Sequence, residues 1–280
     1  MKNLLLRSVT GIIYIAVIVC GIMLPSPAIW VLIFLLAVGA ASEYHQLTQK
    51  LGSSGNSPLM FFDTLGVMSV SLLAATAATP GGMGVISMIM FIVLYMLSRP
   101  IVALYNADMK KSLVDLGFAM LALVYIGLPL CCMGWMSLMN GGRWLLLGMF
   151  ILIWLNDTGA FIIGSMLGSK KLFERLSPKK SWEGFFGGLV FCIIGGVVYY
   201  YCARSYIPER ISAVDMGVYG AVVAAVATWG DLFESMLKRA AGVKDSGTLL
   251  PGHGGVLDRI DSFLFVAPVT LIYMTIAQIN

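Results

Sequence analysis

Long apolar stretches separated by short polar segments dominate the sequence. We identify about nine of them, at 8–24, 27–42, 59–79, 83–104, 114–138, 143–167, 184–202, 216–237 and 260–278. A helix needs roughly 20 apolar residues to cross the hydrocarbon core, where only its own hydrogen-bond ladder can satisfy its backbone. Because every connection is short, the pattern predicts an all-α fold, a polytopic bundle of membrane-spanning helices in a single domain over 1–280.

The first stretch has a second interpretation. Lys2 and Arg7 precede an apolar run, which is also typical of a secretory signal. The rest of the chain is equally apolar, so we favour an uncleaved first span.

Composition narrows the class of protein. Apolar types make up 59% of the chain and charged types 11%, whereas ordinary soluble domains are about 25% charged. So few charges cannot cover a water-facing surface, which excludes a soluble enzyme and a disordered chain. A nucleic-acid partner is also excluded, because it requires clustered basic surface. We predict an integral membrane protein whose partner is the lipid bilayer.

The positions of lysine and arginine predict the orientation. With a cytoplasmic N-terminus, three of the 18 basic residues fall outside, namely Arg143, Arg204 and Arg210. Cytoplasmic loops carry the excess of positive charge in membrane proteins. The pattern therefore predicts an N-terminus in the cytoplasm and, after nine spans, a C-terminus outside.

Polar residues crowd into 156–261, so we expect 1–140 to be mostly scaffold and 141–280 to be the catalytic half.

Asp63 and Asp115 lie near span ends without companions, and we interpret them as packing residues. Asp157 lies in the middle of an apolar stretch, where a charge costs about 2.5–3.5 kcal/mol. It is either functional or a polar contact between helices.

Residues 228–239 place polar groups on one helix face. Asp231, Glu234, Ser235 and Lys238 are spaced i, i+3, i+4 and i+7, which puts them within an arc of about 100°. The alternative is a salt bridge between helices, but that would need only one acid. These four polar residues therefore favour a polar cavity at the cytoplasmic end.

The next segment combines glycines with charges. Glycines allow a ligand close to the backbone, and their N–H groups can face anions. Carboxylates from two helix ends, with cations between them, suit Mg²⁺ and a polyphosphate. A basic loop that contacts lipid headgroups would explain the cations but not the aspartates. The residues concerned are Lys244, Asp245, Gly254, Gly255, Asp258, Arg259 and Asp261.

A third cluster precedes the seventh stretch. Pro178 or Ser181 could begin that helix, which would leave free N–H groups beside Lys179 and Lys180. This arrangement suits a phosphate group. Orientation alone would also place a basic loop here, and both interpretations stay open.

The stretch 235–261 resembles the signature of phosphatidate cytidylyltransferases, also called CDP-diacylglycerol synthases. That pattern runs Ser-x-x-Lys-Arg, four residues, Lys-Asp, a short spacer, His-Gly-Gly and Asp-Arg-x-Asp. Segments 156–159 and 177–184 also fit the family. The fixed positions are all present, as Ser235, Lys238, Arg239, Lys244, Asp245, His253, Gly254, Gly255, Asp258, Arg259 and Asp261.

The resemblance implies a reaction in phospholipid biosynthesis, in which CTP and phosphatidic acid give CDP-diacylglycerol and pyrophosphate. It also implies Mg²⁺ as cofactor, with a second cation left open, and a homodimer in a bacterial cytoplasmic membrane. Asp231 and Asp258 are then the expected metal ligands. Asp261, like Asp157, is either a further ligand or holds the basic residues in place.

Roles for the other residues follow from the chemistry. A phosphate monoester is largely dianionic at pH 7, so it needs charge neutralisation and alignment rather than a base. His253 is therefore expected to contact phosphate or shape a turn. Catalytic residues are predicted as Asp231, Lys238, Arg239, Lys244, Asp245, His253, Arg259 and Asp261; substrate-binding residues as Asp157, Lys179, Lys180, Ser181, Ser235, Gly254 and Gly255.

Two rival functions fit the sequence less well: the pattern from Lys244 to Asp261 argues against a kinase, and the dense basic loops near Asp231 argue against a transporter. A CTP-dependent lipid-alcohol kinase would release CDP, and its alcohol would need deprotonation. A transporter or flippase would use the buried acids as ion sites without nucleotide turnover.

Overall fold

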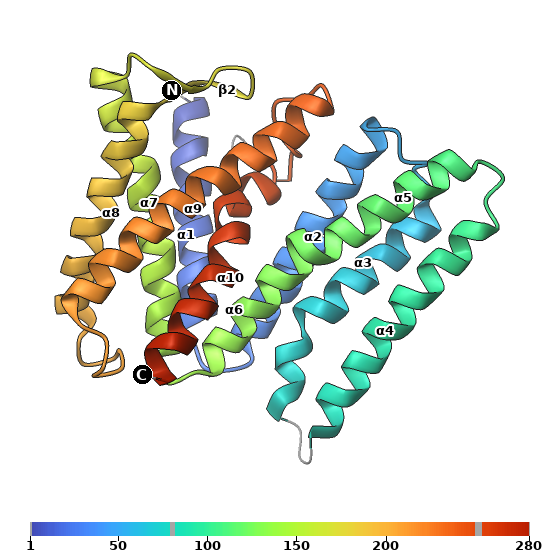
Figure 1. Cartoon of the computed structure of the whole chain (residues 1–280), viewed down its shortest axis with the longest axis horizontal. Helices are drawn as coiled ribbons and strands as arrows, with labels where there is room; N and C mark the ends of the chain where they lie inside the picture. The colour runs from blue at the N-terminus through green and yellow to red at the C-terminus, as the bar shows by residue number, and fades with distance from the viewer. Residues whose placement is uncertain (1, 79–81, 250–253, 280) are drawn as a thin grey trace. The chain divides into compact units, whose positions relative to one another are not determined.

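The computed structural model describes residues 2–78, 82–249 and 254–279, which are mostly helical (Figure 1). Each of the nine predicted stretches contains helix in the described residues, but 59–79 is divided between two helices, which end at Ser71 and Ala78. The elements are α1 (Lys2–Met23), α2 (Ala28–Lys50), α3 (Ser57–Ser71), the 3-10 helix η1 (Leu73–Ala78), α4 (Met83–Leu104), α5 (Met109–Ala122), the π-helical turn η3 (Leu123–Gly127), α6 (Leu128–Leu138), α7 (Gly142–Leu167), β1 (Lys171–Phe173), β2 (Ser177–Ser181), α8 (Trp182–Ala203), α9 (Ala213–Ala240) and α10 (Leu257–Ile279).

Seven helices in the described ranges are long and apolar enough to cross a membrane: α2, α4, the continuous helix Met109–Leu138, α7, α8, α9 and α10. The other two predicted stretches form shorter apolar helices, Val9–Met23 and Pro58–Ser71. The all-α, multi-pass membrane fold is therefore confirmed, and the count of nine spans is approximate.

The chain forms two compact units. Unit 1 comprises Met1–Trp135 and Leu237–Ile260, and unit 2 comprises Met136–Met236 and Asp261–Asn280. Most of the signature thus folds with the N-terminal helices. The prediction of one domain, with its division near residue 140, stays a prediction.

In unit 1, helix α2 continues beyond the predicted stretch 27–42 and ends at Lys50. The prediction ended too early because Glu43 and His45 look like the polar end of a span. In the structure both side chains are buried, beside Tyr44 and Leu47. Packing thus extends the helix by two turns.

Unit 1 also buries an ion pair. Arg99 Nε of α4 donates to Asp63 Oδ1 of α3 at 2.7 Å, and Tyr95 donates its hydroxyl to the same oxygen at 2.8 Å. Arg99 is only 2% exposed. Asp115 of α5 accepts a hydrogen bond from Ser54 N at 2.9 Å. Both aspartates hold neighbouring segments together, which agrees with a packing role. The expectation that they lack companions is wrong, because Arg99 and Ser54 come from other segments of the chain.

We expect Asp63→Ala to lower the free energy of unfolding by about 3–5 kcal/mol, because it leaves the Arg99 charge buried without its partner. Thermal unfolding of the purified protein in detergent measures the effect. Replacing both residues by apolar ones, Asp63→Leu with Arg99→Met, should recover most of the loss. An unchanged unfolding temperature in Asp63→Ala would contradict a structural role for the pair.

In unit 2, α7 and α8 lie side by side (Figure 1). A Cβ at Gly184 would lie 2.8 Å from Ala160 O and 3.3 Å from Gly164 Cα, so a larger residue there would push the helices apart. Small residues allow this close approach in membrane helices.

The segment before α8 is a β-hairpin, whereas the sequence suggested a loop. Strands β1 and β2 pair antiparallel, with Lys171 opposite Ser181. Glu183 accepts hydrogen bonds from Ser169 N and Lys170 N, each at 3.2 Å, which fastens the start of the hairpin. Of the two predicted starts of the helix, Ser181 is correct. Its Oγ accepts from Gly184 N at 3.1 Å and caps α8.

Candidate active site

Unit 2 contains a cavity of about 300 Å³ between α7, the hairpin, the start of α8 and α9. Its wall combines charged groups with the aromatic side chains of Phe161 and Phe185. The polar residues that line it are Asn156, Asp157, Lys179, Lys180, Ser181, Thr228 and Asp231. The predicted substrate-binding residues Asp157, Lys179, Lys180 and Ser181 thus come together with Asp231.

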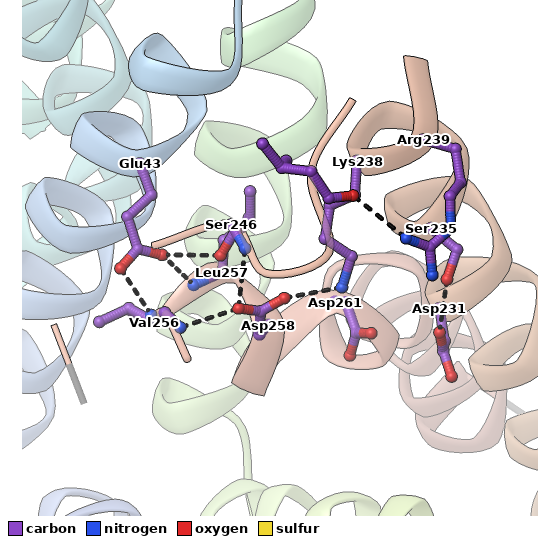
Figure 2. A network of polar contacts seen from close by, with 12 residues as sticks. Glu43, Asp231, Ser235, Lys238, Arg239, Ser246, Val256, Leu257, Asp258 and Asp261 are labelled. Atoms are coloured by element: carbon purple, nitrogen blue, oxygen red, sulfur yellow. Dashed lines mark hydrogen bonds and ion pairs between the residues drawn. The ribbon is translucent and has the colours of Figure 1, made fainter. Parts of the chain in front are cut away.

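Asp231 is held from two directions. Lys180 Nζ, from the hairpin, lies 2.5 Å from Asp231 Oδ2. Ser235, one turn along α9, points its hydroxyl toward Asp231 Oδ1 at 3.3 Å (Figure 2). Both side chains of the ion pair remain partly exposed, so the pair can open toward a charged ligand.

Asn156 also lines this cavity. Its side chain is buried, and its Oδ1 accepts no hydrogen bond from the described residues. A buried polar atom normally has a partner. This oxygen packs against α8, because a Cβ at Gly188 would overlap it.

In unit 1, Asp258 is the centre of a second polar cluster (Figure 2). Lys238 Nζ donates to Asp258 Oδ1 at 2.7 Å. Asp258 Oδ2 accepts from Ser246 N at 2.9 Å and from Gly255 N at 2.8 Å. Asp258 thus joins the end of α9, the following loop and the start of α10.

The backbone conformation and the close packing at position 254 explain why this residue is a glycine. Its φ is +82°, a conformation that favours glycine, and a Cβ there would lie 2.6 Å from Asp258 Oδ2. The backbone must approach this carboxylate closely for the cluster to form.

Glu43 belongs to the same cluster, and sequence reasoning missed it. Its carboxylate accepts hydrogen bonds from Ser246 Oγ at 3.0 Å, Val256 N at 2.9 Å and Leu257 N at 2.8 Å (Figure 2). It is 1% exposed. The available signal was an acid directly after an apolar stretch, which is also how an ordinary span ends.

The remaining predicted residues belong to the end of α9, the start of α10 and the segment between them. Arg239 donates to Val243 O at 3.2 Å. Asp261 of unit 2 is partly buried, and its Oδ1 accepts from Ser262 N at 2.6 Å. His253 lies outside the described residues. Exposed side chains are those of Lys244, Asp245 and Arg259.

The donors in the unit 2 cavity fit Mg²⁺. Within the described ranges, no group of three or more His, Cys, Asp or Glu side chains could hold a metal. Mg²⁺ does not require such a group, because it usually takes one or two carboxylates, waters and the phosphates of its substrate. Asp157 and Asp231 supply oxygens of this kind.

Comparison with known proteins agrees with the signature. Phosphatidate cytidylyltransferase of Bacillus subtilis (strain 168) is 40% identical over 160 residues, which cover 55% of this chain and 56% of the relative. The enzyme of the same name from Staphylococcus haemolyticus is 37% identical over 160 residues, which cover 57% and 59%. The chain therefore spans less than two-thirds of the length of these relatives. A family model described as the cytidylyltransferase family matches residues 5–277. Since this match covers almost the whole sequence, the chain belongs to the cytidylyltransferase family.

Proposed function

We propose that the protein transfers the cytidylyl group of CTP to phosphatidic acid, giving CDP-diacylglycerol and pyrophosphate. The observation that carries the proposal is the cavity of unit 2, where lysines and carboxylates meet beside aromatic rings in a chain of this family. An amphipathic substrate needs both kinds of surface. A lipid phosphate is such a substrate, because its headgroup is anionic and its acyl chains are apolar.

The residues suit attack by one anion on another. The lipid phosphate is largely dianionic at neutral pH, so it does not need a general base. Lys179 and Lys180 line the cavity and can bind phosphate oxygens. Asp231 keeps the Lys180 ammonium in place until a phosphate competes for it. Alignment and charge neutralisation are what this reaction requires.

We propose Mg²⁺ as the cofactor. When bound, the ion neutralises charge on the phosphates and on the departing pyrophosphate. Asp157 and Asp231 would hold it in unit 2. That Asp258 and Asp261 are also ligands stays a prediction, as does a second cation. The hydrogen bonds of Asp258 support a role in shaping the signature segment.

We propose further that the N-terminus and the cavity face the cytoplasm, with the C-terminus outside, in a bacterial inner membrane. The distribution of lysine and arginine supports this orientation. A homodimer stays a prediction from the resemblance.

Lys180→Met should lower kcat/KM for the phosphate-bearing substrates by roughly 10–100-fold, since hydrogen bonds to charged groups contribute about 1.5–3 kcal/mol. Initial rates in detergent, with CTP and phosphatidic acid varied in turn, measure the loss. Lys171→Met is the matched control, because Lys171 lies on the paired strand β1 and does not line the cavity. Equal effects of the two substitutions would contradict a specific role for Lys180.

Comparison of acceptors tests the proposed function. The purified protein receives CTP, Mg²⁺ and either phosphatidic acid or diacylglycerol, and mass spectrometry follows the products. We expect CDP-diacylglycerol to form with phosphatidic acid and not with diacylglycerol. CDP formation with diacylglycerol would favour the lipid-alcohol kinase. Lipid or ion movement across vesicles without CTP consumption would favour the transporter.

A further inference from the structure

We propose that Glu43 is a positioning residue for the reaction, because it fixes the signature loop from helix α2. The signature loop is defined as residues 241–256, between α9 and α10, of which 241–249 and 254–256 are described. The inference rests on the proposed function and assigns a role to the N-terminal part of the chain.

The Glu43 carboxylate joins the two arms of the signature loop, which are its described parts 241–249 and 254–256. Oε2 accepts from Ser246 Oγ on the first arm and from Leu257 N just beyond the second. Oε1 accepts from Val256 N. Val256 and Leu257 lie at the start of α10, where backbone N–H groups have no partner within the helix. A carboxylate at a helix N-terminus is favourable, so Glu43 caps α10 from another part of unit 1.

Ser246 connects Glu43 to the signature. It donates its hydroxyl to Glu43 and its backbone N–H to Asp258 Oδ2. Asp258 in turn holds Lys238. The contacts therefore run from Glu43 through Ser246 and Asp258 to Lys238, all within unit 1. Glu43 would act on the reaction through these residues.

The space around Gly255 gives independent support. A Cβ at this position would overlap Glu43 Oε2 and the Ser246 hydroxyl. Glycine at this point of the signature is thus explained by the approach of a buried carboxylate from α2. A carboxylate enclosed this closely fixes Ser246 relative to Val256 and Leu257 at the start of α10.

Asp115 provides a matched control. It is a buried carboxylate of the same unit, and it also accepts a backbone hydrogen bond from a loop, at Ser54 N. That loop lies between α2 and α3, outside the signature. Neutralising Asp115 should therefore affect stability without affecting the signature loop.

The experiment compares Glu43→Gln with Asp115→Asn in the full chain, purified in detergent. The amide nitrogen of glutamine cannot accept a hydrogen bond, so at least one of the three donors loses its acceptor. Each variant is measured for unfolding temperature, for kcat and KM, and for hydrogen exchange of the amides at 254–258.

We expect Glu43→Gln to lower kcat by about tenfold or more, with KM within about threefold, because residues that align reacting groups act in the transition state. Exchange at Val256 and Leu257 should accelerate. Asp115→Asn should change neither kcat nor that exchange, even where its unfolding temperature falls equally. The proposal is wrong if Glu43→Gln keeps its kcat, or if Asp115→Asn loses as much at equal stability.

Ser246→Ala tests the same contact if Glu43→Gln does not fold. It removes only the hydroxyl donated to Glu43 and should also accelerate exchange at the start of α10. Unchanged exchange in Ser246→Ala would overturn the proposed link. The proposed function has its own test, and it is wrong if the unaltered protein forms no CDP-diacylglycerol. In that case the comparison of hydrogen exchange still decides whether Glu43 holds the signature loop.

Discussion

Asp231→Asn is expected to lower kcat by roughly 10²–10³-fold, the loss typical when a preorganised electrostatic group is removed from an active site. Its carboxylate lies in the cavity of unit 2 and pairs with Lys180. An amide cannot neutralise the ammonium, and it binds a hard cation poorly. Initial rates at saturating CTP and phosphatidic acid measure the effect.

Asp215→Asn is the control for the loss of a charge on the same helix. Asp215 is exposed near the start of α9, where it accepts hydrogen bonds from Ser212. Its replacement should leave kcat near that of the unaltered protein. A normal kcat in Asp231→Asn, with the protein folded, would remove Asp231 from the catalytic machinery.

The second large effect is expected for Asp258→Asn, also roughly 10²–10³-fold in kcat. The single amide oxygen can accept from Ser246 N and Gly255 N, but the amide nitrogen then faces the Lys238 ammonium. Lys238 loses its charge partner, and the signature loop loses part of its support. Rates and unfolding temperature are measured together, so that loss of structure is separated from loss of turnover.

A double-mutant cycle with Lys238→Met separates two roles of Asp258. If Asp258 acts only by holding Lys238, the double variant should be no slower than the slower single variant. Additive losses would mean that Asp258 also acts on its own, as a metal ligand would. A kcat within about tenfold of normal in Asp258→Asn would contradict both roles.

The helices could be predicted from the sequence because the bilayer imposes a length and an apolar composition on each span. The hairpin before α8 could not, because its strands are short, rich in lysine and interrupted by Pro178. They lack the alternation of apolar and polar residues that identifies a half-buried strand. The cap at Ser181 was predictable, since serine at such a boundary has a local role.

The polar clusters were visible in the sequence, but their partners were not. Spacing along one helix relates Asp231 to Ser235, whereas no local pattern relates Asp231 to Lys180 on the hairpin. Glu43 is the clearest case, because its partners Ser246 and Leu257 lie 203 and 214 residues away. Only packing within unit 1 brings them together.

The fate of each phosphorus of CTP tests the central claim most directly. Purified protein is incubated with phosphatidic acid, Mg²⁺ and CTP labelled at either the α or the γ phosphorus, and lipid is then separated from the aqueous phase. Cytidylyl transfer predicts that the α label enters the lipid and that the γ label leaves as pyrophosphate. One pyrophosphate should appear for each CDP-diacylglycerol formed. Entry of the γ label into lipid, or of neither label, would contradict the account.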